Sequence, residues 1–223
     1  MNQMLICSVL VGLAANFGMC QETIVPTTLS ESTQPGYSVM RLFLKSSNPE
    51  DFAPLTRQER LRIYLARTYG LGSTLGAATV GGFEQWINTP SEWGHGSEGY
   101  RKRFANAYAT HIIQGTTEYG FSALLDEDNR YRRSLETGFW RRSKHAITGA
   151  FSSTDDAGQQ HFSYSRVGAA GTAAFVRRTW QPHSTDGVGD AAASFGILLS
   201  AQVGQNLFRE FWPDLKGRLF KKK

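Results

Sequence analysis

The sequence predicts an all-α fold, a compact bundle of five or six helices with Gly/Ala-rich packing faces, preceded by a flexible leader. In the long segments, apolar residues recur every three to four positions, as they do along one face of a helix. Small residues also repeat four positions apart, as in the series Ala192, Gly196, Ser200 and Gly204. About 200 residues follow the N-terminal apolar run, which is enough for one domain with its own core.

Residues 1–20 are predicted to be a signal peptide. Their apolar run, 4–15, has the length of a signal-peptide core and is shorter than the ~20 residues of a membrane span. Cleavage after Cys20 is one alternative and acylation of Cys20 is the other, although Met19 is large for the position before a lipidated cysteine. Since Cys7 and Cys20 are the only cysteines, the mature chain is expected to contain no disulfide.

Residues 21–53 are rich in Thr, Ser and Pro, a composition that predicts a flexible polar leader. The helical domain is predicted to span 54–215. Thr56 and Glu59 have the spacing of a capping box, which predicts a helix over 57–70. The inner face of this helix is predicted to carry Leu61, Tyr64 and Leu65.

The next segment, 70–88, carries small residues in pairs four positions apart, such as Gly72 with Gly76 and Ala77 with Gly81. Each interior glycine costs a helix about 1 kcal/mol relative to alanine. Close packing against another helix is the expected compensation.

The central helix is predicted over 97–128, with Ser97 as its N-cap and a length of roughly 48 Å. His111 and Glu118 fall on one face of this helix, because steps of three and four residues return to the same side. These two side chains are candidate catalytic residues, with Asp126 and His95 as further candidates. The alternative is a hydrogen-bonded face of an ordinary bundle helix.

A charge block follows the central helix. Its acids, at 126–128, and its arginines, at 130–133, predict an ion-pair network at the helix end. The alternative is a carboxylate cluster for acid chemistry or for a cation.

Three more elements are expected in the second half of the chain. A helix is expected through 146–153, followed by a turn at 154–158. A second helix is capped by Ser163 or Ser165. The last helix covers 189–211 and is stopped or kinked by Pro213.

The positive charge is concentrated at the C-terminus. The chain has 24 basic and 19 acidic residues, and residues 216–223 contain five of the basic residues and no acid. The rest of the chain is therefore neutral. This basic tail is a predicted contact for anionic lipid or another polyanion, through Lys216, Arg218, Lys221, Lys222 and Lys223. Self-association is a second expected kind of contact, whereas no nucleic-acid-binding module is recognisable.

Known catalytic and metal-binding motifs are missing from the sequence. It contains no His-Glu-x-x-His, Gly-x-Ser-x-Gly, P-loop or paired-cysteine spacing, so neither a cofactor nor a metal is predicted. Several segments, among them SEWGHGSEGYRKRFANAY, EYGFSALLDEDNRYRRS and GFWRRSKHAITGAF, resemble an uncharacterised family of bacterial exported proteins. The resemblance covers most of the chain from about residue 54 and implies an envelope location without an assigned activity. Asn129 stands where this family usually has Pro.

Two functional hypotheses follow. The first is a non-catalytic envelope protein, periplasmic or outer-membrane associated, that contacts membrane or itself. The second is a hydrolase or lipid-acting enzyme with a His111/Glu118 site, which requires both side chains to face a common cavity.

Overall fold

The structure is a computed structural model that describes residues 54–219. The predicted signal peptide, the leader and residues 220–223 lie outside the described residues, as do the side chains of Arg218 and Leu219. The described part contains six α-helices and one two-stranded hairpin, together with short 3-10 turns. The predicted all-α fold is confirmed.

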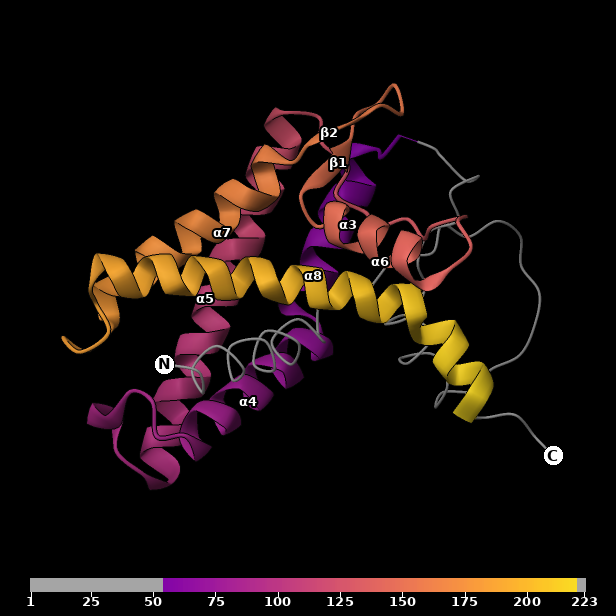
Figure 1. The fold of residues 1–223 in the computed structure, drawn as a ribbon. Helices are drawn as coiled ribbons and strands as arrows, with labels where there is room; N and C mark the ends of the chain where they lie inside the picture. Colours follow the sequence, from indigo (N-terminus) through magenta and orange to yellow (C-terminus); the bar gives the residue numbers. More distant parts are fainter. Residues whose placement is uncertain (1–53, 220–223) are drawn as a thin grey trace, which may run out of the picture.

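The elements follow one another in the order shown in Figure 1, and the connection from α5 to α6 spans residues 125–138. The helices are α3 (Arg57–Tyr69), α4 (Leu71–Trp86), α5 (Gly96–Leu124), α6 (Phe139–Thr148), α7 (Tyr164–Val176) and α8 (Val188–Leu219). The hairpin is formed by β1 (Ser152–Thr154) and β2 (Gln160–Phe162), and the 3-10 turns are η1 (Ser91–Trp93) and η2 (Arg177–Trp180).

Helix α5 is the axis of the bundle, because α3, α4 and α7 all pack against it. Helix α8 packs on α7 and on α6, and it crosses in front of α5 in Figure 1. Helix α7 is therefore covered on two sides, and four of its alanines are completely buried, at positions 169, 170, 173 and 174.

The predicted close packing through small residues is present. A Cβ on Gly81 of α4 would lie 2.9 Å from the backbone nitrogen of Phe104 in α5. A Cβ on Gly115 of α5 would lie 2.5 Å from the hydroxyl of Thr68 in α3. Both pairs of helices thus approach to distances that a larger residue does not allow.

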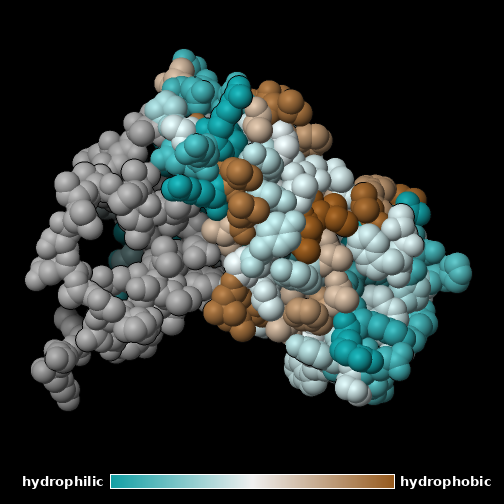
Figure 2. Space-filling model, turned by 180° about the vertical axis from the view of Figure 1, so that it is seen from behind, coloured by the Kyte–Doolittle hydropathy of each residue, from teal (hydrophilic) through white to brown (hydrophobic). Residues whose placement is uncertain are grey.

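The interior is rich in polar and charged side chains. The fully buried apolar residues of the described chain are nine alanines, Val80 and Tyr131, with no leucine, isoleucine or phenylalanine among them. Large apolar side chains are half-buried or exposed, and Figure 2 shows apolar patches on one face of the molecule. No helix within residues 54–219 has the combined length and apolarity that crossing a membrane needs.

The prediction that Leu61 and Leu65 lie on the inner face of α3 is wrong. Leu61 is 41% and Leu65 47% exposed, whereas the helix turns Tyr64 and Thr68 toward α5. Gly115 has no side chain, so Thr68 packs directly against the backbone of α5 at this position. A leucine of α3 is too large for the same place.

Two further elements differ from expectation. The helix expected through 146–153 ends at Thr148, and β1 pairs antiparallel with β2 across the predicted turn. Helix α8 continues past Pro213 to Leu219, so the first residues of the basic tail belong to this helix. Proline removes one backbone hydrogen bond from a helix, and here the helix continues despite that loss.

Candidate functional site

The four predicted catalytic residues do not form one site. His111 and Glu118 both face the interior of the bundle, but they line different pockets. His95 is exposed at the N-cap of α5, and Asp126 is exposed just beyond its C-terminal end. The structure thus brings none of the four into the constellation expected for a hydrolase, and their catalytic role stays a prediction.

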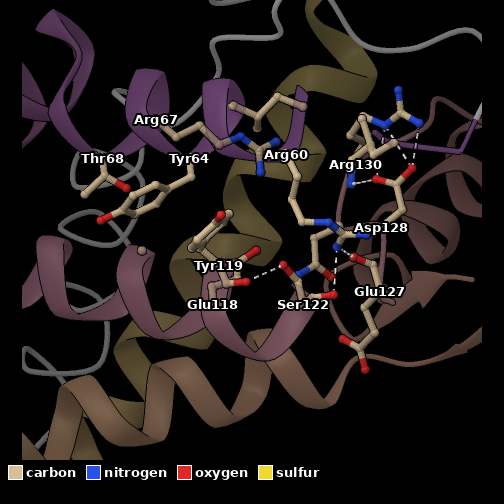
Figure 3. Close-up of a pocket in the computed structure, with 14 residues that line it drawn as sticks. Arg60, Tyr64, Arg67, Thr68, Glu118, Tyr119, Ser122, Glu127, Asp128 and Arg130 are labelled. Carbon is tan, nitrogen blue, oxygen red and sulfur yellow. Dashed lines mark hydrogen bonds and ion pairs between the residues drawn. The ribbon is translucent and has the colours of Figure 1, made fainter. Parts of the chain in front are cut away.

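Glu118 lines a pocket between α3 and α5 that we call the Arg67 pocket (Figure 3). It has a volume of about 60 Å³, enough for a few water molecules. The rings of Tyr64 and Tyr119 stack on one side of it, with centroids 4.6 Å apart. Arg67 extends its guanidinium toward the pocket, and its Nε has no hydrogen-bond partner.

The other charges around the Arg67 pocket are already engaged. Arg60 donates through Nη1 to the carbonyl oxygens of Ser122 and Glu127, at 2.7 and 2.6 Å. Asp128 accepts from Arg130 at 2.7 Å and lies 3.5 Å from Arg132. The predicted ion-pair network at the end of the central helix is therefore present at Asp128.

The middle acid of the charge block has a different role. Glu127 is buried and points away from the Arg67 pocket to the start of α7. Its carboxylate accepts the backbone N–H groups of Tyr164 and Ser165, both at 3.0 Å. It also accepts the hydroxyls of Ser163 and Ser165. A carboxylate at a helix N-terminus is favoured by the helix dipole, so Glu127 is a structural cap, and Ser163 is the N-cap residue.

His111 lines a second pocket, which we call the Glu84 pocket, together with Glu84 and Arg177. It has a volume of about 100 Å³ and mostly apolar walls. Burial raises the pKa of Glu84 to about 7, an effect that the charges of Arg177 and Arg103 oppose. One carboxylate oxygen of Glu84 has no hydrogen-bond partner. His111 is held by the Arg67 carbonyl oxygen, 3.1 Å from Nε2, and burial lowers its pKa.

Sequence reasoning missed Glu84, and it also missed Arg166. Both carry a signal that is visible in the sequence: each is the only charged residue in an otherwise small or apolar helix, α4 and α7 respectively. A lone charge inside an apolar helix is costly to bury, so its presence indicates a polar contact in the interior.

A third feature lies at the surface, where α6 meets the C-terminal half of α8. Phe139 and Trp140 are 61% and 82% exposed, and the Phe139 ring stacks on Phe211 with centroids 5.2 Å apart. Lys144, four positions after Trp140, and Lys216, five positions after Phe211, are both exposed. We call this surface the α6–α8 corner.

Arg142 joins the two helices of the α6–α8 corner. Its Nε donates to Glu210 at 2.8 Å, and its guanidinium carbon lies 4.7 Å from the centroid of Phe211. Burial alone would raise the pKa of Glu210, but the hydrogen bonds from Arg142 and Tyr131 outweigh it and lower the pKa. The aromatic corner therefore has a rigid support.

No metal cluster of three or more His, Cys, Asp or Glu side chains occurs in the part of the chain that the structure describes. Comparison with known proteins gave no match to a family model, a curated protein or a solved structure. The function is therefore argued from the geometry of these sites.

Proposed function

We propose that this chain is a non-catalytic, exported envelope protein that is held at a membrane surface through the α6–α8 corner. The observation that carries the proposal is the exposure of Phe139 and Trp140 beside basic residues at the end of the molecule where the basic tail begins. Tryptophan, whose ring carries an N–H group, favours the interface between lipid and water, and Phe139 adds apolar surface beside it.

Charge supports lipid as the partner of this corner. At this corner Arg141 pairs with Glu136, and Arg142 pairs with Glu210 and Asp214. The positive charge is therefore supplied by Lys144 and by the five basic residues of 216–223. Each basic residue near an anionic membrane contributes about 1 kcal/mol of binding. An apolar surface with a basic rim is typical of proteins that lie in a membrane interface. A second copy of the chain is the other occupant that exposed aromatics permit.

The test is co-flotation of the full chain with vesicles of phosphatidylethanolamine and phosphatidylglycerol. The variant Trp140→Ser is expected to bind about tenfold more weakly, because burying such a side chain is worth at least ~1.5 kcal/mol. Phosphatidylcholine vesicles, which lack net charge, are expected to bind less. Deletion of residues 216–223 is expected to remove the preference for phosphatidylglycerol.

Trp86 provides a matched control. It is 80% exposed and packs edge-on against Phe83 at 5.7 Å, as Trp140 packs against Phe139 at 5.4 Å. It lies at the far end of α4 with an acid, Glu84, as its nearest charge in the sequence. Trp86→Ser is expected to float like the unchanged chain. Because all variants share the apolar segment 4–15, its own affinity for lipid cancels in the comparison.

Three results would contradict the proposal. The unchanged chain does not float, or the two tryptophan variants lose flotation equally, or Trp140→Ser dissociates an oligomer in analytical ultracentrifugation without changing flotation. The last result would assign the corner to self-association.

A second candidate function, acid–base chemistry on a small substrate, rests on Glu84. A carboxyl with a pKa of about 7 in a pocket shared with His111 is poised to transfer protons near neutral pH. The chain is expected to hydrolyse a short p-nitrophenyl ester at a rate that increases as the pH rises through 7. The variant Glu84→Gln is expected to lose this activity. Hydrolysis that is equal in the variant, or absent at every pH, removes this candidate.

A further inference from the structure

The Glu84 pocket is larger than the Arg67 pocket, about 100 Å³ against about 60 Å³. It lies where α4, α5 and α8 meet, because α4 packs on α5 whereas α8 packs mainly on α7 and α6. Its apolar wall is built from short or branched side chains, those of Ala77, Val80, Ala107, Ile197 and Leu198. Ile197 and Leu198 are only half-buried, so one side of the pocket reaches the surface and a small molecule can enter.

Two polar groups that line this pocket are unsatisfied. Gln114 is only 2% exposed, and its Nε2 has no hydrogen-bond partner among the described residues. Within residues 54–219, the Oε2 of Glu84 has none either. Unsatisfied buried polar groups cost free energy. A ligand that donates to Glu84 and accepts from Gln114 removes that cost.

The neighbouring polar groups of the lining are already engaged. The amide oxygen of Asn106 accepts from Trp180 Nε1 at 3.0 Å and from Gln181 Nε2 at 2.6 Å. The hydroxyl of Thr110 donates to the backbone oxygen of Asn106 at 2.8 Å. His111 donates through Nε2 to a backbone carbonyl oxygen of α3 at 3.1 Å. The unsatisfied pair therefore defines where a ligand is held.

The two unsatisfied groups lie at different levels along α5. Asn106 hydrogen-bonds to the carboxylate of Glu84, and Gln114 is eight residues further along the helix, a rise of roughly 12 Å. Both side chains are long and span part of this distance, and the apolar wall lies between them. A ligand that serves both groups therefore needs a polar group at each end and an apolar body in the middle.

The charges of the pocket balance. Within its lining, Glu84 carries the one negative charge and Arg177 the one positive charge, and the two act on each other. The next charges also cancel, because Arg103 acts on Glu84 and Asp190 acts on Arg177. Burial lowers the pKa of His111, so this ring is neutral at pH 7. A charged ligand would leave an unpaired charge in a largely apolar pocket, which is unfavourable.

From these observations we propose that the Glu84 pocket binds a short, uncharged molecule with a hydroxyl group at each end, of which a four-carbon alkanediol is the simplest example. A hydroxyl both donates and accepts hydrogen bonds, so it suits the Glu84 carboxylate at one end and the Gln114 amide at the other. A closed apolar cavity of about 150 Å³ holds benzene. The Glu84 pocket therefore has room for such a diol and excludes a sugar ring or a nucleotide base. This inference rests neither on the proposed membrane contact nor on catalysis by Glu84.

The test is saturation-transfer difference NMR of the full chain at pH 8, where Glu84 is mostly ionised. The probes are 1,4-butanediol, 1-pentanol, butanoate and pentylammonium, which have equal numbers of non-hydrogen atoms and differ in charge and in polar ends. Both uncharged probes are expected to bind. The two ions are expected to bind at least tenfold more weakly, because each adds an unpaired charge.

Gln114→Met keeps the length of the side chain and removes its N–H group. It is expected to weaken the binding of 1,4-butanediol about tenfold and to leave that of 1-pentanol unchanged, because only the diol has a second hydroxyl. Gln202→Met is the matched control. Gln202 is also buried and its Oε1 has no partner in the described chain, but it lines a different pocket. This control is expected to change neither affinity.

Glu84→Gln removes the negative charge and leaves Arg177, so it is expected to admit butanoate. Thermal unfolding shows whether each variant is folded. Trp140→Ser is expected to bind the diol normally, which separates this site from the α6–α8 corner, and the binding is measured without turnover, which separates it from ester hydrolysis. No saturation transfer to millimolar 1,4-butanediol, or the same diol affinity in Gln114→Met and Gln202→Met, would overturn the proposal and leave water as the partner of the two groups.

Discussion

Arg103 is held in the interior without any carboxylate. It is completely buried in α5, and its guanidinium donates to five oxygens at the end of α4 and in the connection from α4 to α5. Three are backbone carbonyls, at Thr89, Gly94 and Pro90, and two are the side-chain oxygens of Gln85 and Asn88. This one side chain therefore organises the whole connection.

Replacement of Arg103 by methionine is expected to lower the free energy of unfolding by about 3–5 kcal/mol, because it leaves buried carbonyl groups without donors. Chemical denaturation measures the change. Arg101→Met, two positions away and exposed, is the control and is expected to change stability by less than about 0.5 kcal/mol. Equal effects of the two substitutions would show that the buried hydrogen bonds are not needed.

Glu84 makes stability depend on pH. Its pKa in the folded chain, about 7, lies above its ordinary value of 4.5, so the folded state binds the proton more tightly than the unfolded state. Its contribution is therefore fully present below pH 4.5 and is lost as the pH rises to about 7, by up to about 3 kcal/mol.

Glu84→Gln is expected to remove this loss, so that the variant becomes more stable than the unchanged chain at pH 8. Urea denaturation of both chains at pH 5 and pH 8 tests the prediction. Because other groups titrate in both chains, the difference between the two is the quantity to compare. A difference that is the same at both pH values would contradict it.

At the scale of elements, adjacent glycines of α4 serve different purposes. A Cβ on Gly81 meets the α5 backbone, whereas a Cβ on Gly82 meets nothing within 4 Å. Gly81→Ala is expected to lower the free energy of unfolding by about 1–3 kcal/mol, because α4 and α5 must separate. Gly82→Ala is expected to raise it by about 0.5–1 kcal/mol through helix propensity. Thermal denaturation of the two variants measures these changes. A loss of stability in both variants would contradict the different roles assigned to Gly81 and Gly82.

Local sequence signals predicted the start of a helix well where particular residue types are needed to cap it. Thr56 and Glu59 form the expected capping box, with the Thr56 N–H and the Glu59 carboxylate 2.9 Å apart. The hairpin was not predictable in the same way, because strands of three residues show too little alternation to be told from a loop. The continuation of α8 past Pro213 depends on tertiary support, including the Arg142 contact to Asp214 at 2.5 Å.

The candidate site was predictable only in part. Seven residues are almost two full helical turns, so His111 and Glu118 do lie on one face of α5. They are also separated by roughly 10 Å along the axis at 1.5 Å per residue. Residues from other helices complete two pockets instead of one: Glu84 from α4 beside His111, and Arg166 from α7 beside Glu118. One helix's periodicity contains no information about those neighbours.

At the scale of the whole molecule, the arrangement of apolar and charged residues is unusual for a protein surrounded by water. The most deeply buried residues are alanines and hydrogen-bonded polar or charged side chains, whereas the larger apolar side chains are half-buried or exposed. The identity of these residues was visible in the sequence, but which side each one faces depends on close contacts such as Gly115 against Thr68.

This arrangement predicts an inverted response to mutation. Leu71→Ser together with Leu75→Ser, at exposed positions of α4, is expected to change the free energy of unfolding by less than about 1 kcal/mol. Ala173→Leu, at a completely buried position of α7, is expected to lower it by about 1–3 kcal/mol through overpacking. Urea denaturation compares them, and a larger loss from the leucine pair would show that α4 contributes to a conventional core.

The cap that Glu127 provides for α7 has a consequence for folding order. Glu127 accepts the N–H groups of Tyr164 and Ser165, which lie 37 and 38 positions later in the chain. The first turn of α7 therefore uses a long-range contact in addition to its local Ser163 cap. Such long-range contacts slow folding and couple distant segments. The regions before and after the hairpin therefore gain stability together, and cleavage in the loop between β1 and β2 is expected to leave two fragments that remain associated or unfold together.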